Sequence, residues 1–417
     1  MNRLSTYLIV TLVALLVVAC TTDDLTSASL GAQGVISFDA TMEQATVAQG
    51  RISTRAEGEI NEAAVNSNDK GNDELSNQGG FGVFACYTGL HKYVDSNVHP
   101  DFMYNEHVTY DKDKGLWSYS PLKYWPNGEG EATGVTGNVK HYVSFMAYAP
   151  WSDNNDSNPV GFCIPSFSSQ GELGNPWLTY RLHPERMKQV DLLCATPRLD
   201  ETKPADNSRL KFTFGHALAC VGDQVRILCS NGLANQIKAR AVSPITNVKV
   251  EVTSLTIQYT LTAKARLVLW NGGGEPNWKA IMSEDPTCTR SVNIITSKTP
   301  VFSYSSGTAK VLEPISGFGV FYIPVEHSGY PQTATVSIVY HISTSTDSGN
   351  TWTDESDKTG TATIILNDPS HSEAYHPGKH LYINISLNAM DISLSAAIAP
   401  WQTLAGYNPK EVEGIED

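Results

Sequence analysis

The sequence predicts an all-β protein built from antiparallel β-sandwiches in tandem. Apolar and polar residues alternate over short stretches along the chain, and clusters of glycine, proline, asparagine and aspartate separate these stretches. No stretch before Asp191 has the 3.6-residue period of a convincing helix. The chain has 417 residues, of which only 17% are charged. This length predicts two domains, and the composition suits pleated, half-buried surfaces with many turns.

The first predicted strand covers residues 35–42. Its alternate residues are apolar and would share one face of a sheet, and they are Ile36, Phe38, Ala40 and Met42. A polar segment with Arg51 and Arg55 follows, and residues 57–80 are typical of a polar loop. The stretch therefore predicts a strand with cleavable backbone on its C-terminal side.

Further strands, most of them alternating, lie on both sides of a charged segment with two prolines, residues 197–208. They are expected at residues 82–87, 141–149, 210–221, 248–252, 336–342, 381–387 and 392–398. Because residues 197–208 offer little to bury, they mark the predicted domain boundary. We expect an N-terminal sandwich domain over residues 56–205 and a C-terminal one over residues 206–417.

The N-terminus has the features of an export signal. Residues 8–18 form an apolar core after Arg3, too short for a permanent span of ~20 residues. Residues 1–19 are therefore predicted to be a signal peptide. The sequence LVVAC that ends at Cys20 resembles the lipobox of bacterial lipoproteins, which implies lipidation of Cys20 and a membrane anchor. The ordinary alternative is a signal peptide with a cysteine there by chance. Residues 20–55 would be a tether followed by the first strand.

Candidate catalytic, metal and cofactor sites are weak in this sequence. We expect no enzyme activity, no cofactor and no metal, because the chain lacks a CxxC pair, a phosphate loop and a nucleophile elbow. His216 shares a face with Phe212 and Phe214, which favours a core histidine over a catalytic one. The Pro377-Gly378 pair argues against joint metal binding by the histidines around it. The other cysteines are expected to be mostly buried thiols.

Charge and aromatic content narrow the possible partners. The net charge of −14 argues against nucleic-acid binding, because a phosphate backbone needs clustered Lys and Arg and the sequence has no such cluster. Aromatic residues gather between Tyr104 and Trp125, where they could stack on a glycan, although aromatic residues in a sandwich are mostly core. The alternative function from this block is a monomeric surface lipoprotein that binds glycan or a protein partner through aromatic loops.

Several motifs together resemble the fimbrillin-like proteins, or type V pilins, of Gram-negative anaerobes. They follow the leader and first strand in order: Thr54-Arg55-Ala56, WSYSPLKYWP from Trp117, VSFMAYAP from Val143, DLLCA from Asp191, FTFGHAL from Phe212 and PGKHLYINI from Pro377. The resemblance implies two transthyretin-like sandwich domains and a cell-surface location at the outer membrane or in a fimbrium. It also implies other fimbrial subunits and an Arg-specific surface protease as partners. Assembly would follow removal of the first strand, when a neighbour's strand fills the groove.

The cleavage and donor segments can be assigned to residues on this basis. We expect cleavage after Arg55, which leaves Ala56 as the N-terminus, with Arg51 as the alternative site. The candidate donor strand near the C-terminus has alternating apolar residues, namely Ile392, Leu394, Ala396 and Ile398. The alternative is that this segment is only the hairpin partner of residues 381–387, which would favour a tip or anchor subunit over a stalk subunit.

Overall fold

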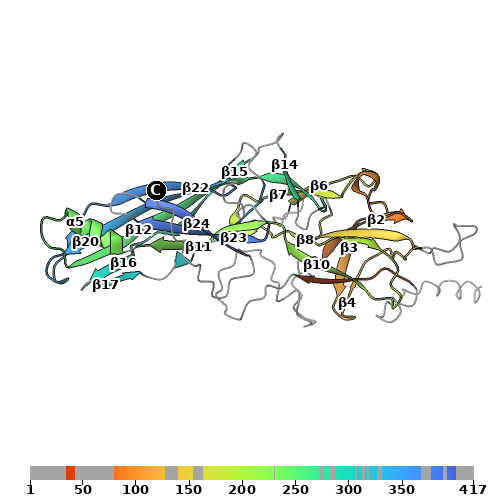
Figure 1. Ribbon diagram of the computed structural model, residues 1–417, viewed down its shortest axis with the longest axis horizontal. Helices are drawn as coiled ribbons and strands as arrows, with labels where there is room; N and C mark the ends of the chain where they lie inside the picture. Colours follow the sequence, from red (N-terminus) through yellow and green to blue (C-terminus); the bar gives the residue numbers. More distant parts are fainter. Residues whose placement is uncertain are drawn as a thin grey trace, which may run out of the picture.

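The computed structural model confirms the predicted all-β class. It describes residues 34–42, 79–126, 140–153, 163–229, 231–272, 277–281, 287–305, 308–311, 315–316, 319–325, 331–367, 377–387 and 392–400. The described strands form four sheets in an elongated molecule (Figure 1). The first sheet lies at one end, the sheet around β12 and β20 lies at the other, and a small sheet lies between them. None of the described helices is long and apolar enough to cross a membrane.

The first sheet has the order β1-β10-β8-β5-β2-β3-β4, and β9 also pairs with β5. Its strands are β1 (Phe38–Met42), β2 (Phe81–Gly89), β3 (Met103–Asp111), β4 (Leu116–Ser118), β5 (Tyr142–Ala149), β8 (Leu193–Ala195), β9 (Arg198–Glu201) and β10 (Leu210–His216). Successive side chains of β2 point to opposite faces. Phe81 and Val83 enter one core and Phe84 enters another, so this sheet is buried on both sides.

A small four-stranded sheet joins segments from the two halves of the chain. Its order is β14-β13-β7-β6, with β6 (Cys163–Phe167), β7 (Trp177–Arg181), β13 (Lys264–Val268) and β14 (Asn277–Ala280). The antiparallel ladder between β7 and β13 places Tyr180 opposite Ala265. A ladder of backbone hydrogen bonds therefore connects residues of the two predicted domains.

Two further sheets form the other sandwich. The larger has β17-β16-β12-β20-β21 in order, with β15 on β12 and β22 on β20, and the smaller has β18-β11-β23-β24, with β19 on β11. Their strands are β11 (Ala219–Leu228), β12 (Asn247–Thr262), β15 (Thr287–Ile295), β16 (Thr299–Ser305), β17 (Thr308–Val311), β18 (Ile315–Ser316), β19 (Val320–Tyr322), β20 (Thr333–Ser345), β21 (Thr353–Asp354), β22 (Lys358–Ile365), β23 (Lys379–Leu387) and β24 (Ile392–Pro400).

The described helical parts are short. They are the 3-10 turns η1 (Asp95–Asn97) and η2 (Arg186–Lys188) and the helix α5 (Asn231–Arg240). The sequence analysis predicted no helix at α5. Leu233 and Ile237 lie one turn apart and are both buried, so one side of α5 packs against the core. Lys238 and Arg240 lie in its last turn, where positive charge is favourable.

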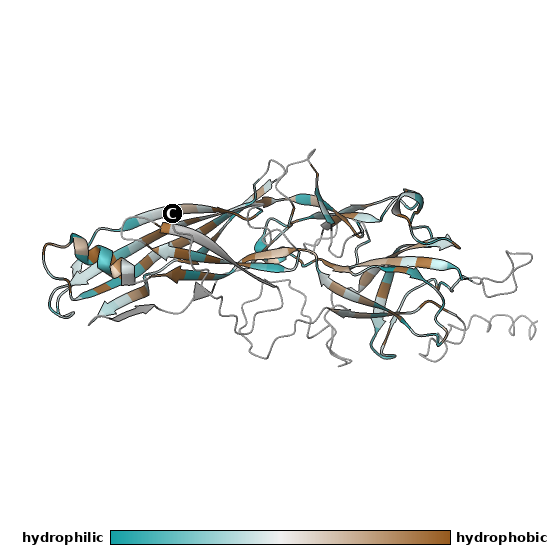
Figure 2. Ribbon diagram, viewed as in Figure 1, coloured by the Kyte–Doolittle hydropathy of each residue, from teal (hydrophilic) through white to brown (hydrophobic). Residues whose placement is uncertain are grey.

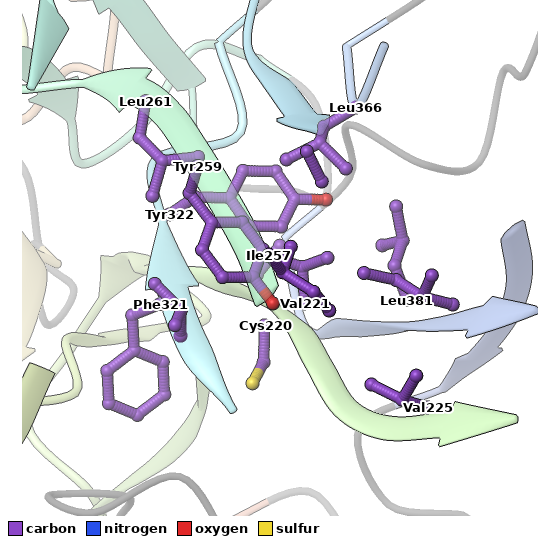
Figure 3. Packing of buried hydrophobic residues seen from close by; sticks show 14 of the residues in the cluster. Cys220, Val221, Val225, Ile257, Tyr259, Leu261, Phe321, Tyr322, Leu366 and Leu381 are labelled. Carbon is purple, nitrogen blue, oxygen red and sulfur yellow. The ribbon is translucent and has the colours of Figure 1, made fainter. Parts of the chain in front are cut away.

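Two hydrophobic cores hold these sheets together. The smaller core lies on one face of the first sheet and is lined by β1, β2, β5 and β10. The larger core continues from the other face of that sheet, through the small sheet, into the second sandwich. In Figure 2 the strands carry alternating hydrophobic and hydrophilic segments. In Figure 3 Ile257 and Tyr259 of β12 pack with Val221 of β11 and Leu381 of β23 inside the second sandwich.

Two strand pairs differ from the antiparallel arrangement that the sequence predicts. β1 pairs with β10 in parallel, and β11 pairs with β23 in parallel. In addition, the proposed boundary between residues 205 and 206 falls before β10, whereas sheet membership changes after His216. The division into residues 56–205 and 206–417 stays a prediction.

Candidate functional site: the first strand and its groove

The first strand lies at the edge of the first sheet and closes the smaller core. β1 pairs with β10 over its whole length, with Phe38 opposite Leu210 and Met42 opposite Phe214. It is the red arrow beside β10 in Figure 1. In the described part of the chain β10 is the only strand in a ladder with β1, so the backbone holds β1 from one side.

The residues just before β1 contact the opposite wall of the groove. Val35 forms an antiparallel bridge with Tyr124. The Ile36 N–H donates to the Lys123 carbonyl at 2.9 Å, and the Trp125 N–H donates to the Gly34 carbonyl at 2.9 Å. The N-terminal segment therefore lies between β10 and the segment that follows β4, and it occupies a slot that has backbone partners on both sides.

Phe38 is the central apolar side chain of this slot. It is fully buried, and its ring lies 5.5 Å from Phe212 and 5.4 Å from Tyr119 between centroids. Phe81 and Phe145 meet the same ring edge-on at 6.4 and 6.0 Å, an arrangement that aromatic pairs favour. Removing Phe38 would leave a cavity walled by aromatic rings.

The other three residues of the predicted apolar face lie in or against the same core. Ile36 and Met42 are buried, and Ala40 is half-buried and packs against the cluster. Asp39, on the other face, is exposed and lies 4.0 Å from the guanidinium of Arg209. Ser37 departs from the predicted pattern because it is buried.

Tyr119 ties the strand to the aromatic block. Its hydroxyl donates to the Ile36 carbonyl at 2.8 Å. Burial raises the pKa of the Tyr119 phenol, so the hydroxyl keeps its proton and remains a donor. Without the first strand, this buried hydroxyl would lose its closer acceptor, since the Lys123 carbonyl is 3.4 Å away.

The candidate donor segment is an edge strand of the second sandwich. β24 pairs antiparallel with β23 from Ile392 opposite Leu387 to Pro400 opposite Lys379. Leu394 lies opposite Ile385, Ala396 opposite Ile383 and Ile398 opposite Leu381. The described chain therefore has the hairpin arrangement that the sequence analysis left open as the alternative. β24 ends the path of its sheet.

The predicted anchor and cleavage residues lie outside the described residues. They are Cys20, Arg51, Arg55 and Ala56. Both arginines fall between the end of β1 at Met42 and the start of β2 at Phe81. Any cut there separates β1 from the rest of the chain.

Most of the aromatic block belongs to the core. Trp117, Tyr119 and Trp125 are buried, whereas Tyr124 is 46% exposed. Tyr104 and Tyr110 are half-buried. These burial values leave little flat aromatic surface for a sugar in this block.

Two buried histidines have carboxylate partners that the sequence analysis did not foresee. His216 Nδ1 lies 2.6 Å from Asp191 Oδ2, and His380 Nδ1 lies 2.9 Å from Asp223 Oδ2. His216 is thus a core histidine paired with an acid. The partners are separated by 25 and 157 residues, so no local motif could have revealed them.

Cys86, Cys194, Cys229 and Cys288 are free thiols. All but Cys288 are buried. Burial raises the pKa of Cys86, Cys194 and Cys229 to about 12. For Cys86 the nearby carboxylate of Asp101 adds to this effect. These three residues behave as small apolar side chains, as expected.

Comparison with known proteins links this fold to fimbriae. No family model matches the chain. A stretch of 156 residues is 28% identical to fimbrium subunit Fim1C of Phocaeicola vulgatus. The match covers 36% of this chain and only 37% of the length of Fim1C. The crystal structure of a fimbrial protein from Bacteroides vulgatus has a TM-score of 0.52 at 19% identity, over 88% of this chain and 99% of that one. These matches confirm the resemblance to the fimbrillin-like proteins, in sequence over part of the chain and in fold over most of it.

Proposed function

We propose that this protein is a structural subunit of a cell-surface fimbria, assembled by donor-strand exchange after proteolysis and contributing to adhesion. The observation that carries the proposal is the position of the first strand. It fills a core slot at a sheet edge, and it is joined to the rest of the chain by the segment that holds Arg51 and Arg55. The resemblance to Fim1C supports the same function.

Removal of the strand would create a strong binding groove. Four buried apolar side chains leave with it, namely Val35, Ile36, Phe38 and Met42. At ~1.5–3 kcal/mol for each, their burial amounts to roughly 6–12 kcal/mol. The edge of β10 would also lose its backbone partners. An edge of this kind is a template for another strand, and insertion of a neighbour's strand restores both ladder and core.

The trigger in this proposal is an Arg-specific surface protease that cuts after Arg55, with Arg51 as the alternative. Before the cut, a lipid on Cys20 holds the subunit at the outer membrane. N-terminal sequencing of assembled material should give Ala56, and Ile52 would move the site to Arg51. Replacing Cys20 with serine should abolish labelling by a clickable fatty acid.

The donor in this proposal is β24 of a neighbouring subunit. It is an edge strand with apolar residues at alternate positions, and it can leave β23 without breaking a central ladder. The neighbour's Leu394 and Ile398 would then enter the groove that Phe38 and Met42 vacate. A subunit that keeps β24 in its own hairpin would instead serve as a tip or an anchor.

The test is a protease-dependent ladder of oligomers from the purified chain. The double substitution Leu394→Asp with Ile398→Asp should abolish the ladder and leave the monomer folded, because the charges would have to enter a neighbour's core. The matched control is Ser393→Asp with Ser395→Asp, on the alternate positions of the same strand, which should still polymerise. Unfolding of the Leu394/Ile398 monomer would overturn the donor role of β24. A wild-type chain that is cut but stays monomeric would overturn the fimbrial proposal.

A further inference from the structure

A buried cluster of polar side chains lies in the second sandwich, away from the groove of the first strand. It comprises Cys220 and Asp223 on β11 and His380 on β23. Their potential ligand atoms all lie within 4.8 Å of one another, and all three residues are buried. This is the one such group of metal-binding side chains among the residues that the structure describes.

A local irregularity of β11 brings the three residues together. Cys220 lies directly opposite His380 in the parallel ladder, and the register shifts between Val221 and Val225. Gly222, at the start of this bulge, has a φ of +77°, a conformation that favours glycine. The bulge turns Asp223 back toward His380, so that Oδ2 reaches Nδ1 at 2.9 Å. Bulges of this kind often re-aim a side chain next to a functional site.

Unpaired buried polar atoms mark the same place. Among the described residues, the second carboxylate oxygen of Asp223 has no hydrogen-bond partner, and neither has the hydroxyl of Tyr259, although both residues are fully buried. Tyr259 comes from β12 in the facing sheet, and Figure 3 shows its hydroxyl beside Val221 and Cys220. A Cβ on Gly222 would lie 2.1 Å from that oxygen, so only glycine leaves room for it. Buried polar atoms without partners are costly and call for a physical explanation.

We propose that Cys220, Asp223 and His380 bind a divalent transition-metal ion of the zinc class. A thiolate, a carboxylate and an imidazole nitrogen are the donors that zinc prefers, usually in a tetrahedral site. Zinc bonds of ~2.0–2.3 Å require ligand atoms roughly 3.3–3.7 Å apart, so the widest pair would have to approach by about 1 Å. The Cys220 thiol gives up its proton to solvent on binding. The two negative ligands then neutralise the dication inside the core.

The second histidine–aspartate pair shows what distinguishes this cluster. Asp191 and His216 are also buried and lie 2.6 Å apart, but they do not belong to a three-ligand group in the described chain. The thiol of Cys220 is what makes the Asp223 cluster a metal site.

A metal at this position would cross-link β11 to β23, the strand that carries β24. It would therefore hold the end of β23 that begins at Lys379. This inference does not rest on the proposed fimbrial function, because it concerns the subunit alone.

The experiment uses the full-length chain, refolded from denaturant under reducing conditions with one equivalent of Co²⁺, a spectroscopic substitute for zinc. We expect about one bound Co²⁺ per chain and a near-ultraviolet band from the thiolate–cobalt bond. We also expect Zn²⁺ to raise the Tm of the wild-type chain, because a ligand that binds only the folded state stabilises it.

Variants locate the site. Cys220→Ser should remove the band, and Asp223→Asn or His380→Gln should weaken zinc binding by about 10–100-fold or more. Cys229→Ser and Asp191→Asn are matched controls, because they change a buried thiol and a histidine-paired acid elsewhere in the chain. Both should keep the band and the zinc-dependent rise in Tm.

A further measurement does not depend on the folding of any variant. In wild-type protein, Zn²⁺ should protect Cys220 more than Cys229 from maleimide at intermediate urea concentrations, as read by peptide mass spectrometry. A wild-type chain that retains no Co²⁺ would overturn the proposal. A band that persists in Cys220→Ser, or equal protection of the two thiols, would also overturn it.

Discussion

Phe38 touches four aromatic rings, from β2, β5, β10 and the segment after β4. Phe38 is also the one aromatic residue of β1. Asp39, its neighbour, points away from the core and has only a distant, exposed ion pair. The difference between adjacent positions makes them a natural pair for measuring how firmly the strand is seated.

Phe38→Ala should lower the unfolding free energy of the uncleaved chain by about 3–5 kcal/mol, because the aromatic walls cannot close fully on the cavity. Urea unfolding followed by fluorescence measures the change. Asp39→Ala is the control and should cost less than about 1 kcal/mol, as exposed ion pairs contribute little. A loss below about 1 kcal/mol for Phe38→Ala would show that the strand is not seated in the core.

The buried thiols predict a dependence on pH. Because burial raises the pKa of Cys86, Cys194 and Cys229 to about 12 from an ordinary value of 9.0, the folded state holds these protons more tightly than the unfolded state. Their stabilisation is complete below pH 9 and is lost as the pH rises toward 12. Iodoacetamide at pH 8 should therefore leave these three thiols unmodified in the folded chain and modify half-buried Cys288, as read by mass spectrometry. Rapid labelling of Cys194 would contradict its burial.

The sequence predicted the apolar face of the first strand because that pattern is local. Apolar residues alternate over residues 35–42, and the side chains of a strand point to opposite faces in turn. This pattern predicted that Ile36, Phe38 and Met42 lie on one face. The Cys220–Asp223–His380 cluster left no such signal. Its members come together only because β11 and β23 are neighbours in space, and the bulge at Gly222 decides where Asp223 points.

At the scale of elements, the parallel pairs organise both sandwiches. In the first sheet, β1 pairs in parallel with β10, and in the second sandwich β11 pairs in parallel with β23. In each case an early strand lies beside a late one. Alternation within a strand is the same for both pairing directions, so the sequence predicted the strands but not this arrangement.

An isolated strand should therefore bind back to its groove. A peptide of residues 34–42, added to the chain that begins at Ala56, should raise the Tm in a concentration-dependent way, because it binds only the folded state. The control peptide carries Phe38→Asp, which would place a charge among aromatic rings and should have no effect. Differential scanning fluorimetry measures both. Equal shifts from the two peptides, or none from either, would mean that the groove does not recognise the strand.

At the scale of the whole molecule, a β-ladder, a ring contact and a hydrophobic core connect the two predicted domains. The ladder between β7 and β13 joins residues on both sides of the predicted boundary. The indole N–H of Trp278 on β14 donates to the Ala217 carbonyl at 2.6 Å, and its ring meets Tyr180 of β7 at 6.2 Å. The larger core also runs through both halves. Composition identified a polar segment at residues 197–208, but it could not show that β10, which follows this segment, completes the first sheet.

This arrangement predicts the behaviour of fragments. A fragment of residues 34–205 lacks β10, and with it Phe212 and Phe214 of the smaller core. It also leaves β1 without its ladder, so it should fail to fold, as judged by circular dichroism and by dispersion in NMR spectra. A fragment of residues 34–218 restores β10 but still exposes Phe84, Tyr148 and Tyr180, which belong to the larger core, so it should aggregate. The intact chain should instead unfold in one transition, with fluorescence and circular dichroism coinciding. A fragment of residues 34–205 that folds with native stability would show that β10 is dispensable and that the polar segment is the true boundary.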